Sequence, residues 1–159
     1  KAVERVNFRQ KDKLFSYISK HFKLDQYPDA IKGKTFALWG LSFKPNTDDM
    51  RAASSLVLMA SLWAAGAKVQ AYDPEAMEET QRICGSRKDL RLMGTKEAAL
   101  QGADALVICT EWQNFRAPDF GLIKEKLNTP TLFDGRNMFN PSRMAEKGFA
   151  YYCIGRGLS

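Results

Sequence analysis

The chain has 159 residues, 45% of them hydrophobic and 26% charged, which is an ordinary composition for one globular domain with its own core. No apolar stretch approaches the ~20 residues that a membrane span needs, and no signal peptide opens the sequence, so we expect a cytoplasmic chain with no membrane partner. The net charge is +6, but residues 1–34 hold nine Lys and Arg against four Asp and Glu, so most of the positive charge belongs to the N-terminal arm. Because the rest of the chain is nearly neutral and has no nucleic-acid-binding motif, we expect no nucleic-acid partner.

The N-terminal arm has the pattern of an amphipathic helix. One helical face over residues 3–22 contains positions 3, 6, 10, 14, 18 and 22, which are apolar except at Gln10, and basic residues lie between them. The turn-forming residues 25–29 end this helix. Because the sequence begins on Lys1 inside the helical pattern, we expect it to be a piece of a longer protein.

Strand-like and helix-like segments alternate after the arm. Strands are predicted at residues 35–40, 68–72, 91–93, 105–109, 131–133 and 150–154. Helices are predicted at residues 53–65, from the turn at Asp73-Pro74 to about 84, at 95–100 with Thr95 as N-cap, at 120–127 and at 141–147. This alternation predicts an α/β fold: a Rossmann-like three-layer αβα domain whose mainly parallel sheet has about six strands, preceded by a long helix.

The loop after the first strand is the most informative segment, because ligands of open α/β sheets bind at the carboxyl ends of the strands. It reads Gly40-Leu-Ser-Phe-Lys-Pro-Asn-Thr-Asp-Asp-Met-Arg51 and lacks the glycines of a dinucleotide fingerprint. Lys44 and, after a later strand, Arg136 could pair with phosphate oxygens, Arg136 bidentately. Phe43 could stack on a base, and Thr47 could add a neutral donor. The alternative is an Asp/Arg network that only pins the turn, with Asp48 or Asp49 capping the next helix and Arg51 balancing them.

Other polar residues favour structural roles. Asp73 ends the second strand, where a dinucleotide-binding fold places its ribose carboxylate, but without the fingerprint we prefer a turn residue that helps to start the next helix. Cys109 is interpreted as a core thiol rather than a nucleophile, and the lone His21 lies far from the strand ends in sequence. Asp48 and Asp49 could bind a divalent ion, but the adjacent Lys44 and Arg51 argue against it, so no metal site is predicted.

These residues together resemble a known family. The loop from Gly40 to Arg51, Tyr72-Asp73-Pro74, Thr110-Glu111-Trp112 and Asp134-Gly-Arg-Asn137 resemble motifs of the C-terminal domain of bacterial UDP-glucose 6-dehydrogenases, in the UDP-glucose/GDP-mannose dehydrogenase family. The leading residues resemble the end of that family's central helix, and Tyr151-Tyr-Cys-Ile-Gly-Arg156 resembles its last strand. The resemblance implies that residues 1–32 are the end of the interdomain and dimerisation helix with its linker, and that residues 33–159 are the UDP-sugar-binding domain.

The resemblance also implies the roles of individual residues. Arg136 would be a second substrate contact, Arg51 would reach toward the NAD cofactor on another domain, and Ala52-Ala53 departs from the commoner residues without disturbing these contacts. The loop residues that would line the UDP-glucose site are Phe43, Lys44, Pro45, Asn46, Thr47, Asp48, Asp49 and Met50.

The family oxidises UDP-glucose to UDP-glucuronate with two NAD, through a cysteine that lies upstream of the central helix. We therefore expect no catalytic residue among these 159 and no activity of the chain alone, while the full-length enzyme forms a homodimer or larger homo-oligomer. Two other hypotheses remain open at this point. One is a dehydrogenase of the same family for UDP-N-acetyl-hexosamine or GDP-mannose, and the other is a stand-alone module that docks through the basic helix 1–24.

Overall fold

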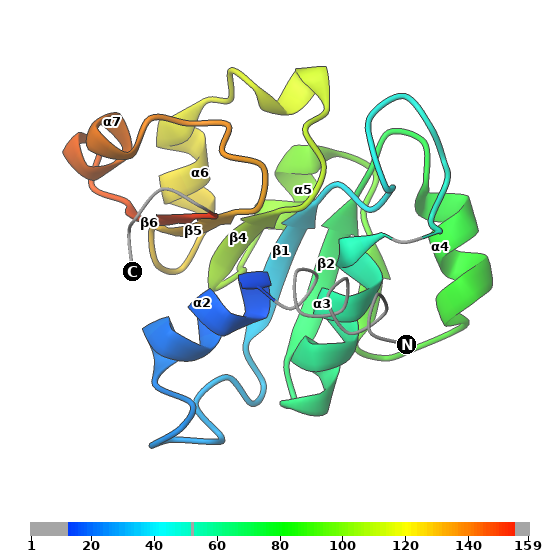
Figure 1. The fold of residues 1–159 in the computed structure, drawn as a ribbon, viewed down its shortest axis with the longest axis horizontal. Coiled ribbons are helices and arrows are strands. Elements are labelled where there is room, and N and C mark those ends of the chain that lie inside the picture. The colour runs from blue at the N-terminus through cyan, green and yellow to red at the C-terminus, as the bar shows by residue number, and fades with distance from the viewer. Residues whose placement is uncertain (1–12, 52, 155–159) are drawn as a thin grey trace, which may run out of the picture.

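Six parallel strands form the centre of the molecule (Figure 1). The structure is a computed structural model and describes residues 13–51 and 53–154. The strands are β1 (Thr35–Trp39), β2 (Lys68–Tyr72), β3 (Leu90–Leu92), β4 (Ala105–Ile108), β5 (Thr131–Asp134) and β6 (Ala150–Cys153). Their order across the sheet is β3-β2-β1-β4-β5-β6, and every neighbouring pair is parallel. The predicted Rossmann-like sheet is confirmed, and among the described residues it is wholly parallel.

Helices cover both faces of the sheet and complete the three predicted layers. They are α2 (Lys13–Phe22), α3 (Ser54–Ala64), α4 (Met77–Cys84), α5 (Lys96–Leu100), α6 (Phe120–Lys126) and α7 (Pro141–Glu146), with a 3-10 turn η1 at Gln113–Phe115. Figure 1 shows α2 and α3 in front of the sheet and α5 behind it. Thr95 caps α5 as predicted, because its side chain accepts a hydrogen bond from the N–H of Ala98.

The two faces of β1 belong to two separate hydrophobic cores. Phe36 and Leu38 pack with the core that α2, α3 and α4 cover, whereas Ala37 and Trp39 pack with the core under α5, α6 and α7. All four are almost completely buried. A strand buried on both faces has no polar alternation, which is why these segments appear in the sequence as continuous apolar runs.

The N-terminal arm, in its described part, is packed on the domain. Leu14 and Ile18 of α2 are buried in the same core as Phe36. The predicted start of this helix at residue 3 lies outside the described residues, as do Ala52 and the predicted motif positions 155 and 156. The division into residues 1–32 and 33–159 stays a prediction, although α2 shares a core with the sheet that follows it.

Candidate ligand-binding site

The loop after β1 runs from Gly40 to Arg51 and projects beyond the carboxyl end of the sheet, near α4 (Figure 1). Gly40 opens it with φ 95°, a backbone conformation that favours glycine. A Cβ atom at this position would lie 2.6 Å from the backbone N of Thr110, the second residue after β4. Thr110 Oγ1 also donates a 2.7 Å hydrogen bond to the carbonyl oxygen of Ser42. The loops after β1 and β4 are therefore in contact where the strand order reverses, the usual ligand position of such sheets.

Asp73, the residue after β2, fixes the base of this loop. It is fully buried, and its Oδ2 accepts hydrogen bonds from the backbone N–H groups of Leu41 at 2.7 Å and Ser42 at 3.1 Å. The indole Nε1–H of Trp112, from the loop after β4, donates to the same oxygen at 3.1 Å. One carboxylate thus connects the loops that follow three neighbouring strands.

The other oxygen of Asp73 shapes the turn into α4. Its Oδ1 accepts hydrogen bonds from the N–H groups of Glu75 and Ala76, each at 2.8 Å. The predicted turn role of Asp73 is confirmed. Because five N–H groups occupy the two oxygens, the carboxylate is not free to bind ribose hydroxyls, and the structure disfavours that alternative.

The outer part of the loop is exposed. The N–H of Phe43 donates a 2.8 Å hydrogen bond to the carbonyl of Asp49 and closes the loop at its neck. Phe43 itself is 49% exposed, an unusual position for a large apolar ring and a suitable one for contact with a ligand. Of the residues between them, Pro45 and Thr47 are partly buried, whereas those exposed are Lys44, Asn46 and Asp48.

Asp49 and Arg51 form an ion pair at the end of the loop. Arg51 Nε donates to Asp49 Oδ1 and Nη2 to Oδ2, each at 3.0 Å. The hydrogen bond from the Arg51 side chain, together with one from its backbone N–H, lowers the pKa of Asp49 to about 2. Arg51 thus balances Asp49, as the alternative of an Asp/Arg network held, yet its side chain is 91% exposed and open to a further partner. The helix cap that the same alternative assigned to Asp48 or Asp49 is wrong, because the N-cap residue of α3 is Ala53.

Met50 lies beneath the loop rather than on its surface. It is 2% exposed, and the hydroxyl of Thr80 in α4 lies 3.6 Å from its sulfur. Its side chain therefore supports the loop from the core side. Beside it, an open groove of about 780 Å³ separates residues 47–51 from α4, where Glu79 and Arg82 form an ion pair.

The loop after β5 forms the second part of the site. Asp134 is fully buried and organises this loop: its Oδ1 accepts a 2.8 Å hydrogen bond from the N–H of Arg136, and its Oδ2 accepts one of 2.7 Å from Met138. The phenol of Tyr151 on β6 donates to Oδ2 at 2.6 Å. The backbone of Arg136 is thereby fixed at the carboxyl end of β5.

Gly135 brings this loop against two other elements. A Cβ atom at Gly135 would lie 2.8 Å from Leu14 Cδ1 of α2 and 2.9 Å from the carbonyl oxygen of Ile108 in β4. No side chain fits there without a shift. The described part of the N-terminal arm therefore reaches the carboxyl edge of the sheet, a contact that nothing in the sequence pattern indicates.

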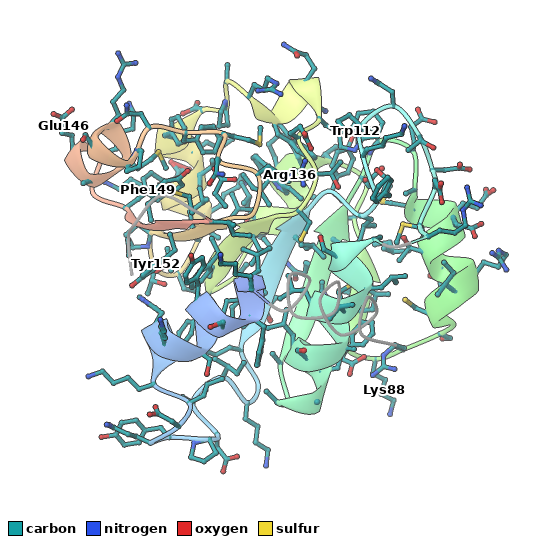
Figure 2. All side chains as sticks on the ribbon, in the orientation of Figure 1. Lys88, Trp112, Arg136, Glu146, Phe149 and Tyr152 are labelled. Carbon is teal, nitrogen blue, oxygen red and sulfur yellow. The ribbon has the colours of Figure 1, made fainter. Side chains whose placement is uncertain are left out.

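Arg136 is paired with Glu111 from the loop after β4. The Nε of Arg136 lies 2.9 Å from Glu111 Oε1, and Nη2 donates a 2.9 Å hydrogen bond to Oε2. Burial, the largest single influence, raises the pKa of Glu111, but the hydrogen bonds from Arg136 and the backbone together with the charges of Arg136 and Arg116 outweigh it, and the pKa lies below its ordinary value. Glu111 is consequently a carboxylate at neutral pH. Figure 2 labels Arg136 and, nearer the loop after β1, Trp112.

Cys109, Cys153 and His21 belong to the packing of the domain and not to the Glu111–Arg136 pair. Cys109 is 5% exposed, and burial raises the pKa of its thiol to about 12, which confirms the predicted core thiol. Cys153 is 1% exposed. His21 Nδ1 lies 2.7 Å from the hydroxyl of Tyr152, and its ring contacts Phe133, so it belongs to the packing of α2 on the sheet.

Among the described residues, neither a membrane-spanning helix nor a cluster of metal ligands is present. None of the helices within residues 13–51 and 53–154 is long and apolar enough to cross a membrane. In the same part of the chain, no three His, Cys, Asp or Glu side chains are grouped in a way that could hold a metal ion.

Fold and site together define a Rossmann-like domain in which basic side chains and an exposed aromatic ring lie where the strand order of the sheet reverses. The sequence profile of the UDP-glucose/GDP-mannose dehydrogenase family, UDP binding domain, matches residues 37–141, which include both polar loops. The chain belongs to this family and carries its UDP-binding domain.

Curated relatives agree with the family match. The chain is 46% identical over 161 aligned positions to the UDP-glucose 6-dehydrogenase of Pseudomonas aeruginosa, an alignment that covers 98% of this chain and 34% of the relative. It is 45% identical to the UDP-glucose 6-dehydrogenase of Rhizobium meliloti, over 79% of this chain and 28% of that protein. The chain thus spans about a third of the length of these relatives.

Solved structures share the fold. A UDP-D-ManNAc dehydrogenase from Pyrococcus horikoshii matches 99% of this chain with 33% of its own, at a TM-score of 0.74 and 23% identity. A UDP-glucose dehydrogenase from Pyrobaculum islandicum matches 95% of this chain with 31% of its own, at a TM-score of 0.73 and 24% identity. At these identities the likeness establishes the fold alone.

Proposed function

We propose that the chain is the C-terminal, nucleotide-sugar-binding domain of a cytoplasmic UDP-glucose 6-dehydrogenase. The whole enzyme would oxidise UDP-glucose to UDP-glucuronate with two NAD. The observation that carries the proposal is the match of the family's UDP-binding domain to residues 37–141, because this range contains the loop after β1 and Arg136. The relatives that are 46% and 45% identical, both UDP-glucose 6-dehydrogenases, favour glucose as the sugar.

Within this proposal the exposed loop tip binds the nucleotide sugar. Phe43 contacts the uracil or the ribose with its exposed ring, and Lys44 contacts the diphosphate as a point charge. Arg136 is the second cationic contact, from the neighbouring loop. Residues 45–49 complete the lining through their backbone and polar side chains. The buried Met50 contributes support from below.

The same proposal assigns NAD to another part of the enzyme. The loop after β1 lacks the glycine-rich turn that lets a pyrophosphate approach the backbone, and the carboxylate of Asp73 is occupied by protein N–H groups. Arg51 is the residue of this chain that we assign to NAD, because its side chain is 91% exposed at the end of the loop. The catalytic cysteine would also belong to the other part, and the enzyme would act as a homodimer or larger homo-oligomer.

A ligand-dependent melting experiment tests the binding function. We expect millimolar UDP or UDP-glucose to raise the Tm of the chain, because a ligand that binds only the folded state stabilises it by mass action. Uridine, which lacks phosphate, is the control and should raise the Tm less. A folded chain whose Tm does not respond to millimolar UDP would contradict the proposal.

Sugar selectivity needs a separate competition experiment. In the full-length enzyme, UDP-glucose is expected to be oxidised in preference to UDP-N-acetylglucosamine and GDP-mannose. Competing the three substrates at equal concentration and comparing their kcat/KM values tests this point. A higher kcat/KM for either competitor would show that the protein is a dehydrogenase of the same family for that other nucleotide sugar.

A further inference from the structure

The Glu111–Arg136 pair joins the two loops whose strands lie side by side at the sheet edge. Glu111 follows β4 and Arg136 follows β5, and Ile108 pairs with Asp134 in the register of these two strands. Arg136 Nη2 donates a 2.9 Å hydrogen bond to Oε2, and Nε lies 2.9 Å from Oε1 as a close ion-pair contact that is not a hydrogen bond. A charge-assisted hydrogen bond with a second close contact beside it restricts where the guanidinium lies.

Both partners stand on backbone that has little freedom. Arg136 N–H is bonded to Asp134 Oδ1, and the N–H of Gly135 donates a 2.9 Å hydrogen bond to the carbonyl of Ile108. Glu111 lies between two buried residues whose side chains are hydrogen-bonded, Thr110 to the loop after β1 and Trp112 to Asp73. The pair therefore positions one long side chain on a rigid frame.

The shape of the guanidinium decides which donors remain for a ligand. Arginine has five N–H donors in one plane, and the Glu111 carboxylate lies against the edge formed by Nε and Nη2, where Nη2 is the hydrogen-bonded donor. The end-on edge, formed by Nη1 and the outer N–H of Nη2, is left for a bidentate contact. The Arg136 side chain is 42% exposed, so the pairing with Glu111 does not enclose it.

We propose that Glu111 is a positioning residue: it holds Arg136 by one edge so that the opposite edge meets the diphosphate of the nucleotide sugar. The inference rests on the proposed function, since it requires Arg136 to bind the ligand. Without Glu111, the Arg136 side chain would have to be ordered at the moment of binding, which costs affinity. Removing the carboxylate also removes a repulsive charge, but that contribution is screened at high ionic strength.

A double-mutant cycle on UDP binding by the chain separates positioning from a general structural role. Glu111→Ala is expected to weaken UDP binding roughly five- to tenfold at high salt, the cost of ordering one long side chain. In an Arg136→Ala background, Glu111→Ala should change the Kd less than about twofold, because its target is gone. Glu111→Gln should recover part of the loss, since the amide oxygen still accepts one N–H from Arg136.

Matched controls keep the cycle interpretable. Glu125→Gln makes the same charge change at an exposed position on α6, whose carboxyl end lies at the opposite edge of the sheet, where the N–H of Gly102 bonds to the carbonyl of Lys126. It should leave the Kd for UDP unchanged. Uridine binding should not respond to Glu111→Ala. The melting temperature of each variant shows whether it is folded, and Glu111→Gln, which keeps the side-chain volume, carries the test if Glu111→Ala does not fold.

An NMR readout follows the pair directly. The Nη2–H resonance of Arg136 should stay protected from solvent exchange both without and with UDP, because its hydrogen bond to Glu111 is kept in the complex. Loss of this protection on UDP binding would overturn the inference, as would an unchanged Kd for UDP in Glu111→Ala or an equal loss of affinity for uridine and UDP. These outcomes leave UDP binding by the wild type intact. A wild-type chain that binds no UDP would overturn the proposed function and this inference together.

Discussion

The base and the tip of the loop after β1 differ in almost every physical property. At the base, Leu41 and Ser42 are buried and hydrogen-bonded to the carboxylate of Asp73. At the tip, Phe43 and Lys44 are exposed above a neck closed by one backbone hydrogen bond. The contrast shows how a single segment of about a dozen residues can be fixed where it joins the sheet and accessible at its tip, where we propose that the ligand binds. Changes at the base should cost stability, and changes at the tip should cost binding.

Removal of the Asp73 carboxylate should have the largest effect on the base. Asp73→Ala leaves buried N–H groups without acceptors, and we expect a loss of about 3–5 kcal/mol in the free energy of unfolding. Urea unfolding measures the loss as a lower midpoint with an unchanged m-value. The control is Asp48→Ala at the exposed tip, which should be within about 0.5 kcal/mol of wild type. Equal effects of the two substitutions would remove the distinction between base and tip.

Gly40 tests how closely the loops after β1 and β4 must approach. Gly40→Ala places a Cβ 2.6 Å from Thr110 at φ 95° and should destabilise the fold by roughly 2–4 kcal/mol through clash and strain. Gly33→Ala is the matched control, since Gly33 also has positive φ, 81°, but nothing lies within 4 Å of the added Cβ. It should lose only the strain contribution. Thermal unfolding of both variants measures the two losses. Similar Tm values would show that the close approach of Gly40 to Thr110 does not add to the cost of the substitution.

Substitutions of the exposed cations should affect binding alone. Lys44→Ala and Arg136→Ala are each expected to weaken UDP binding roughly tenfold, the loss of one charge-assisted contact, while stability changes by less than about 0.5 kcal/mol. Titration calorimetry measures the Kd. Lys88→Ala removes a charge at an exposed position far from Arg136 (Figure 2) and should bind UDP as the wild type does. A variant of an exposed cation that loses stability but binds UDP as the wild type does would contradict the assignment of stability to the base and of binding to the tip.

A pH effect of smaller size should appear at neither base nor tip but where α2 packs on the sheet. Burial lowers the pKa of His21, so the folded state binds the proton less readily than the unfolded chain does. Stability is therefore complete above pH 6.5, the ordinary pKa of histidine, and decreases as the pH falls below it. The Tm measured between pH 7.5 and pH 5.5 should decline, and His21→Gln should flatten the decline. A profile that is equally steep in the variant would assign the effect to other groups.

The elements were predictable because they depend on local patterns. Strands such as Lys68–Tyr72 have the predicted bounds, and the others agree within one or two residues, since apolar runs between turn residues leave few alternatives. The position of the candidate loop at the carboxyl end of the sheet was predictable as well, because it follows the first strand of such a sheet. The side-chain partners were not. Nothing in the spacing of Glu111 and Arg136 indicates that they pair, because they are 25 positions apart and meet only through the β4–β5 register.

The sequence by itself determined the fold class, the family resemblance and the candidate residues at the strand ends, since each follows from residue types in order along the chain. The tertiary structure decided what those residues do to one another. It buried Asp73 and Met50, paired Arg51 with Asp49 and Arg136 with Glu111, and left the ring of Phe43 exposed. The physical reason is that hydrogen bonds and ion pairs between distant segments depend on strand order and register, which bring the carboxyl ends of β1, β2, β4 and β5 to one edge.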